Sequence, residues 1–201
     1  MKQLIVVEGP AGSGKSTLCS QLSEALGLPH ISRSMPTRDP SVTQAALESS
    51  FNDHYKLVRA LMTPNGAIVD RCTLSQHVYG VLRGTDYDRQ SAGATIHHLS
   101  RLVQEYANDL MFRLGQQIDW PEIQVILLLP PTEVIEKRRS YCQREFPWSA
   151  QMERDLYSAF SYVAPALLPK STTIKVVDGS EDDTEELIYY LTGELPRIKN
   201  G

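Results

Sequence analysis

The chain has 201 residues, of which 41% are hydrophobic and 22% are charged, and its formal net charge at pH 7 is −4. These values are those of a globular protein with one sizeable core, and they exclude disordered and fibrous classes. The acidic balance gives the surface no general attraction for a polyanion. No apolar run approaches the roughly 20 residues of a membrane span, and the chain opens on a strand pattern, so we expect a cytoplasmic protein. The three cysteines, Cys19, Cys72 and Cys142, lack metal-ligand spacing and are expected to be reduced, buried thiols.

The first half of the chain alternates short apolar runs with helical patterns. Leu4 to Val7 is a continuous apolar run, which is typical of a parallel strand buried on both faces. Two prolines and several small polar residues predict a loop over residues 33–43. The expected elements are a strand at 4–7, a helix from Ser16 to Leu26 that ends at Gly27, a short strand at 30–32, a helix at about 44–62 and a buried strand at 67–71.

The second half continues this alternation. Its expected elements are a helix at 74–82, a long helix at about 95–117, a strong strand at 123–130, a helix running into an arginine-rich segment at 132–145, a helix at 152–168, a strand at 173–180 and a final helix at 184–191. Strands that alternate with helices predict a parallel sheet covered on both sides. We therefore expect a single three-layer α/β domain over residues 1–201, with about five strands.

The segment between the first expected strand and helix is a phosphate-binding loop. Gly9-Pro-Ala-Gly-Ser-Gly14-Lys15-Ser16 matches G-x-x-x-x-G-K-[ST] in the strand–helix context that the motif requires. Glycines let backbone N–H groups point at phosphate oxygens, and the helix N-terminus adds positive potential. Lys15 would reach the β- and γ-phosphates, and the Ser16 hydroxyl would bind Mg²⁺, so we predict a P-loop NTPase fold that binds ATP. The expected nucleotide-binding residues are Gly9, Ala11, Gly12, Ser13, Gly14, Lys15, Ser16 and Thr17.

Asp70 and Arg71 end the second long buried strand, at the edge of a parallel sheet where ligands gather. A carboxylate there can orient Mg²⁺ or accept a hydrogen bond from the acceptor substrate. The guanidinium can bridge the donor and acceptor phosphates. We expect both residues to be catalytic, with Asp70 also in the metal site. A surface Asp–Arg pair is the alternative.

The segment from Glu136 to Glu145 carries a cluster of basic residues that includes Arg138, Arg139 and Arg144. Phosphoryl transfer needs positive charge that arrives when both substrates are bound, and mobile arginines meet that need. We expect a short lid at about residues 136–150, with these arginines catalytic, and a solvated helix face is the alternative. Because Arg138 and Arg139 are adjacent on a helix, we expect only one of them to reach the phosphates.

Together these segments resemble the thymidylate kinases and the related deoxynucleoside kinases over nearly the whole chain. Asp70, Arg71, Ser75 and Tyr79 stand at matching steps of the family's D-R-Y-x-x-S-x-x-A-Y segment. "PTRDP" resembles the loop whose arginine holds the acceptor monophosphate, which implies that role for Arg38. The resemblance also places "VVDGS" beside the adenine of the donor. It implies a homodimer formed by the helix at 95–117, which a core helix would equally explain.

Departures from the family pattern concern the acceptor base. Ala11 stands where thymidylate kinases usually carry an acidic residue. Phe51 and Tyr55 are one helical turn apart and could form a stacking wall, with packing against the core as the alternative. His54 could contact the base edge, and an exposed or capping histidine is the alternative. The base therefore stays open between dTMP and a modified or otherwise unusual pyrimidine deoxynucleotide, such as a modified dUMP.

Arg33 and Arg38 follow the short expected strand at 30–32, and their positive charge favours an acceptor that already bears a phosphate. A phosphate is ionised at pH 7 and needs no general base, whereas a sugar hydroxyl does. We therefore expect a nucleoside monophosphate kinase. Its expected substrate-site residues are Arg38, Phe51, His54, Tyr55, Arg71 and Tyr79. The alternatives are a deoxynucleoside kinase with Asp39 or Asp70 as base, a kinase acting on a hydroxyl within DNA, and a nucleotide switch, although no N-K-x-D motif is present. We expect no membrane or nucleic-acid partner.

Overall fold

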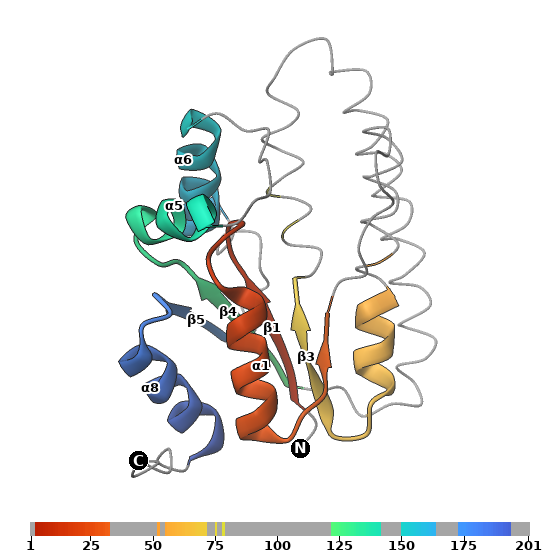
Figure 1. The fold of residues 1–201 in the computed structure, drawn as a ribbon. Coiled ribbons are helices and arrows are strands. Elements are labelled where there is room, and N and C mark those ends of the chain that lie inside the picture. The colour runs from red at the N-terminus through yellow and green to blue at the C-terminus, as the bar shows by residue number, and fades with distance from the viewer. Residues whose placement is uncertain are drawn as a thin grey trace, which may run out of the picture.

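The computed structural model describes residues 3–32, 52, 55–71, 75, 78, 122–141, 150–163 and 173–193. Within these segments, five parallel strands form one sheet in the order β2-β3-β1-β4-β5 (Figure 1). The strands are β1 (Gln3–Glu8), β2 (His30–Ile31), β3 (Gly66–Asp70), β4 (Glu122–Leu128) and β5 (Thr173–Val177). The apolar runs in β1, β3 and β4 explain why these three strands occupy the middle of the sheet.

The helices begin and end close to the positions that the sequence predicts. They are α1 (Lys15–Leu26), a helix over residues 55–62, α5 (Thr132–Tyr141), α6 (Ala150–Ser158), which continues into the π-helical turn η1 (Ala159–Val163), and α8 (Glu181–Thr192). Gly27 ends α1 in the left-handed conformation, and the Ser180 side chain caps α8 by accepting from the Asp183 N–H. None of the helices in the described segments is long and apolar enough to cross a membrane.

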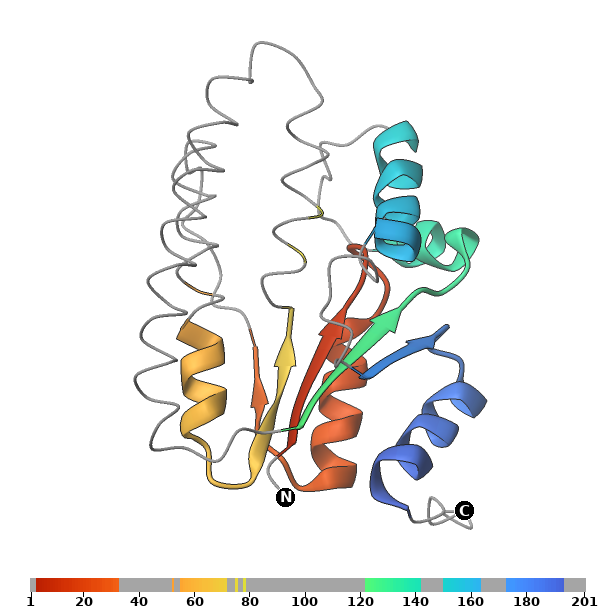
Figure 2. The same ribbon diagram turned by 180° about the vertical axis from the view of Figure 1, so that it is seen from behind.

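Helices cover both faces of the sheet, which confirms the expected three-layer α/β fold. Helices α1 and α8 pack on one face, where Leu22 and Leu187 join the core with Ile5. The helix at 55–62, α6 and η1 pack on the other face, where fully buried Phe160 joins the second core cluster. Helix α1 accordingly lies in front of the sheet in Figure 1 and behind it in Figure 2.

Strand register brings the carboxyl ends of the strands to one edge of the sheet. Val7 pairs with Asp70, and Glu8 pairs with Leu127. The segments that follow β1, β3, β4 and β5 therefore start side by side. In an open parallel sheet, this edge is where ligands bind. Ser75 and Val78, which belong to the expected helix at 74–82, are helical. The expected helix at 95–117 and residues 142–149 of the expected lid lie outside the described residues.

Candidate active site

The P-loop connects β1 to α1 and is shaped by three glycines with positive φ. Gly9, Gly12 and Gly14 have φ angles of 146°, 83° and 100°. A Cβ atom at Gly9 would lie 2.4 Å from the main-chain oxygen of Leu128 on β4, so only glycine fits there. The loop delivers the N-terminus of α1, with its free N–H groups, to the carboxyl edge of the sheet.

Lys15 is the first residue of α1, and its side chain is buried against the loop. Its Nζ donates to the Pro10 carbonyl at 2.5 Å and to Ser13 Oγ at 3.2 Å. Burial lowers the pKa of Lys15 well below its usual value of 10.5, and the nearby Arg71 guanidinium lowers it further. Two neighbouring carboxylates act in the opposite direction. A polyphosphate in the loop would stabilise the charged form of this lysine.

Ser16 and Asp70, which the sequence assigns to a metal site, are in direct contact. Ser16 Oγ donates to Asp70 Oδ2 at 2.6 Å, and Asp70 is the buried last residue of β3. A hydroxyl and a carboxylate are hard oxygen ligands of the kind that Mg²⁺ takes together with water and phosphate oxygens. This donor pair fits Mg²⁺. Thr17 follows on the exposed surface of α1.

Cys19 of α1 and His30 of β2 lie beside Asp70. One ligand atom from each of the three side chains lies within 4.8 Å of the other two. His30 Nε2 is buried without a hydrogen-bond partner. Burial raises the pKa of the Cys19 thiol, and the Asp70 carboxylate raises it further. A neutral thiol is a poor metal ligand, so the chemistry of this edge favours the oxygen site at Ser16 and Asp70. Cys19 is a buried free thiol, as expected.

Arg138 and Arg139 both contact the P-loop from α5. Arg138 Nη1 donates to the Ser13 carbonyl, and Arg139 donates from Nε and Nη2 to the Ala11 carbonyl at 3.2 and 2.9 Å. Arg139 also forms an ion pair with Glu153 of α6. Helical spacing led us to expect only one of the two arginines at the phosphates. The structure places both guanidinium groups on carbonyls of the loop, because Ile135, Arg138 and Arg139 share the face of α5 that lies against it. That only one arginine reaches the phosphates stays a prediction.

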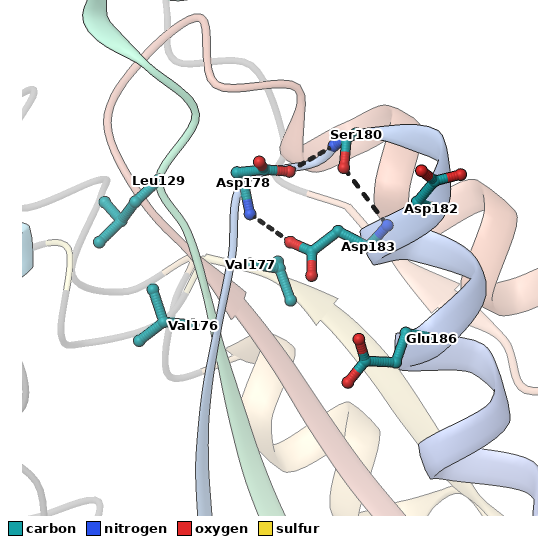
Figure 3. Close-up of a pocket in the computed structure, with 8 residues that line it drawn as sticks. All are labelled: Leu129, Val176, Val177, Asp178, Ser180, Asp182, Asp183 and Glu186. Carbon is teal, nitrogen blue, oxygen red and sulfur yellow. Dashed lines mark hydrogen bonds between the residues drawn. The ribbon is translucent and has the colours of Figure 1, made fainter.

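An open hollow of 460 Å³ lies where β5 meets α8 (Figure 3). Its polar lining includes Asp178, Ser180 and Asp183, which hydrogen-bond to one another. The Ser180 N–H donates to Asp178 Oδ1 at 2.7 Å, and this backbone bond lowers the pKa of Asp178. The hollow is rich in hydrogen-bond acceptors. It belongs to the "VVDGS" segment that the family resemblance places beside the donor base.

The predicted acceptor residues are only partly described. Arg71 follows β3 directly, and its Nη1 donates to Ser75 Oγ at 3.3 Å. Tyr55, on the helix at 55–62, has a side chain that is 63% exposed. Arg38, Phe51, His54, Tyr79 and Arg144 lie outside the described residues and stay predictions.

Two buried charged residues next to the site were not among the predicted site residues. Glu8 ends β1 immediately before the P-loop, and Lys56 lies on the inner face of the helix at 55–62. A signal for each existed in the sequence. Glu8 is a carboxylate that ends a wholly apolar run. Lys56 falls one helical turn before Ala60, on the apolar side of its helix.

Comparison with known proteins shows the fold but no close sequence relative. No family model matches the chain, and no curated protein matches it by sequence. Deoxyadenosine kinase from M. mycoides with bound dATP superposes with a TM-score of 0.68 at 18% identity, covering 96% of this chain and 100% of that one. Thymidylate kinase from Candida albicans gives a TM-score of 0.60 at 20% identity, covering 94% and 90%.

A third solved structure, the YorR protein of Bacillus subtilis in complex with phosphorylated GDP, gives a TM-score of 0.52 at 17% identity and covers 94% of this chain and 95% of that one. All three identities are low, so the similarities establish the architecture rather than the activity. The chain has the P-loop kinase fold of these proteins over nearly its full length.

Proposed function

We propose that this chain is an ATP- and Mg²⁺-dependent kinase that phosphorylates a (deoxy)nucleoside monophosphate. The observation that carries the proposal is the contact of Ser16 with Asp70 at 2.6 Å, beside the P-loop lysine and Arg71. Lys15 and the loop N–H groups bind the donor phosphates, and Ser16 and Asp70 hold the metal. Bound there, Mg²⁺ would neutralise charge on the phosphate oxygens. Similarity to solved kinases of the same fold supports a phosphoryl transfer reaction.

The acceptor is a nucleotide whose phosphate is held by Arg71, together with Arg38. A guanidinium suits a phosphate because it donates two parallel hydrogen bonds to an ionised group, and such an acceptor needs no general base. Arg138 and Arg139 stabilise the transferring phosphoryl group from the far side of the loop. The donor base would lie in the hollow beside α8, and a pyrimidine deoxynucleotide such as dTMP or a modified dUMP is the acceptor that the sequence favours.

A deoxynucleoside kinase is the second candidate. The M. mycoides deoxyadenosine kinase superposes with a TM-score of 0.68, against 0.60 for the Candida albicans thymidylate kinase. This activity requires a carboxylate that deprotonates a sugar hydroxyl. The expected bases are Asp39, which lies outside the described residues, and Asp70, which would have to leave the Ser16 hydroxyl to act as a base.

The test is ATP consumption with a panel of nucleosides, their 5′-monophosphates and a DNA oligonucleotide, with Lys15→Ala as the blank. Turnover with one or a few monophosphates is the expected result, and it would name the base. Turnover with nucleosides alone would replace the proposal with the deoxynucleoside kinase. Turnover with DNA alone would indicate a kinase that acts on a hydroxyl within DNA. Slow hydrolysis that no acceptor accelerates would indicate a nucleotide switch.

A further inference from the structure

Arg71 has an unusual backbone conformation for a residue that must hold a substrate. It is the only non-glycine residue with positive φ (63°) in the described segments. Its N–H donates to the Val7 carbonyl at 3.0 Å, so the chain turns sharply at the point where β3 leaves the sheet. A left-handed conformation strains an arginine and persists only where surrounding contacts hold it.

Lys56 supplies such contacts to the main chain of this turn. Its Nζ donates to the carbonyl of Asp70 at 2.8 Å and to the carbonyl of Arg71 at 2.6 Å. The side chain is 2% exposed, and lysine is almost never so deeply buried without partners. These two bonds fix the peptide groups on both sides of the Arg71 Cα atom. The buried ammonium therefore holds the left-handed turn in place.

Ser75 and Glu8 hold the side chain of the same arginine. Ser75 Oγ accepts from Arg71 Nη1 at 3.3 Å and donates to the Glu8 carboxylate, which also accepts from the Ser75 N–H at 3.3 Å. Glu8 is fully buried and is followed directly by the first glycine of the P-loop. A chain of hydrogen bonds thus runs from the strand that carries the P-loop to the guanidinium of Arg71.

We infer that Lys56, Ser75 and Glu8 are positioning residues that preorganise Arg71 for the phosphate of the acceptor. The inference rests on the proposed function, and it deepens that function by assigning acceptor affinity to groups that do not touch the acceptor. Because the guanidinium is held before the substrate arrives, binding does not have to immobilise it. Loss of the Ser75 contact with the guanidinium therefore raises the KM for the acceptor and leaves donor binding unchanged.

Ser75→Ala is the first test, with Ser23→Ala as the matched control. Ser23 Oγ also donates one partly buried hydrogen bond, at 2.6 Å to Leu28 O, at the far end of α1. We expect Ser75→Ala to raise the acceptor KM about tenfold, the usual effect of losing a hydrogen bond to a charged group. We expect kcat and the Kd of a non-hydrolysable ATP analogue to change less than about twofold. An unchanged acceptor KM, or an equal loss of analogue affinity, would overturn the inference.

The order of the Arg71 side chain is measured separately by ¹⁵N relaxation of its Nε–H group, assigned from the signal that disappears in Arg71→Lys. The order parameter should fall below about 0.6 in Ser75→Ala and in Lys56→Met, and stay at the parental value in Ser23→Ala and Lys175→Met. This readout needs no substrate. If the parental chain phosphorylates no acceptor and the order parameter of Arg71 still falls in Ser75→Ala, the proposed function is refuted and the positioning role is not. An unchanged order parameter in folded Ser75→Ala refutes the positioning role.

Discussion

Gly9→Ala tests whether the packing of the sheet sets the shape of the P-loop. Gly9 has a φ angle of 146°, and a Cβ atom there would lie 2.4 Å from Leu128 O and 3.3 Å from Leu128 C. The obstacle is main chain, so no side-chain rotation relieves it. Leu128 is itself paired with Val177 of β5, and the neighbouring Leu129 N–H donates to the Val177 carbonyl at 2.8 Å. Either the loop or the end of β4 must move.

The size of the effect follows from comparison with Gly27→Ala. Gly27 also has positive φ, at 64°, but a Cβ atom there would meet nothing within 4 Å. Its substitution therefore costs only the strain of the left-handed conformation, about 1–2 kcal/mol. About 0.4–1 kcal/mol of this is offset, because alanine reduces the conformational entropy of the unfolded chain. Gly9→Ala adds a backbone overlap, and its φ of 146° also strains alanine more than the left-handed φ at Gly27 does. We expect a loss of about 4 kcal/mol or more in the free energy of unfolding.

Thermal unfolding measures the difference. For a chain of this size, 1 kcal/mol corresponds to a shift in Tm of about 2–4 °C. Gly27→Ala should therefore lower Tm by a few degrees at most, and Gly9→Ala by about 10 °C or more. Because a moved loop misplaces its N–H groups, ATP binding should weaken in Gly9→Ala and stay unchanged in Gly27→Ala. Equal Tm shifts in the two variants would refute the claim that Leu128 constrains the loop.

Two further predictions concern the charges of the site. Because the pKa of Lys15 is lowered in the folded chain, the unfolded chain binds a proton that the folded chain excludes. The nucleotide-free parental protein should therefore gain stability over Lys15→Met as pH rises toward 10.5, by up to about 1.4 kcal/mol per pH unit. A stability difference that stays constant in denaturant titrations between about pH 7.5 and 9.5 would contradict this. Asp70→Asn should raise the Mg²⁺ concentration for half-maximal turnover about 10–100-fold, while Asp178→Asn leaves it unchanged; an unaltered magnesium dependence in Asp70→Asn would remove Asp70 from the metal site.

The strands of the parallel sheet and the P-loop could be predicted because local chemistry determines both. The apolar run at Leu4–Val7 can be satisfied only by burial on both faces, and three glycines separate it from a helix that ends at Gly27. The position of Asp70 was also predictable, since a carboxylate that ends a buried strand of a parallel sheet lies at the edge where ligands bind. Its contact with Ser16 then follows from strand register, because β1 and β3 are neighbours.

The contacts of Lys56, Arg138 and Arg139 could not be predicted, because they depend on how elements distant in sequence pack. Nothing near Lys56 indicates that its ammonium meets the carbonyls of Asp70 and Arg71, 14 and 15 residues away. The expectation that adjacent arginines diverge treats α5 as an isolated helix. In the structure, the face of α5 that carries Ile135 lies against the P-loop, so that Arg138 and Arg139 reach carbonyls two residues apart.

Three basic side chains donate hydrogen bonds to carbonyl groups of the P-loop. Lys15 binds the Pro10 carbonyl, Arg139 binds that of Ala11, and Arg138 binds that of Ser13. A carbonyl dipole compensates a cation only weakly, and the lowered pKa of Lys15 reflects that shortfall. In the proposed function, a triphosphate would bring full negative charge to the same place, where it would favour the charged form of Lys15 and replace the loop carbonyls as the partner of Lys15 and Arg138. Arg139 already has a carboxylate partner in Glu153. For the proposed kinase activity, the basic groups that would stabilise phosphoryl transfer are therefore already gathered at the loop.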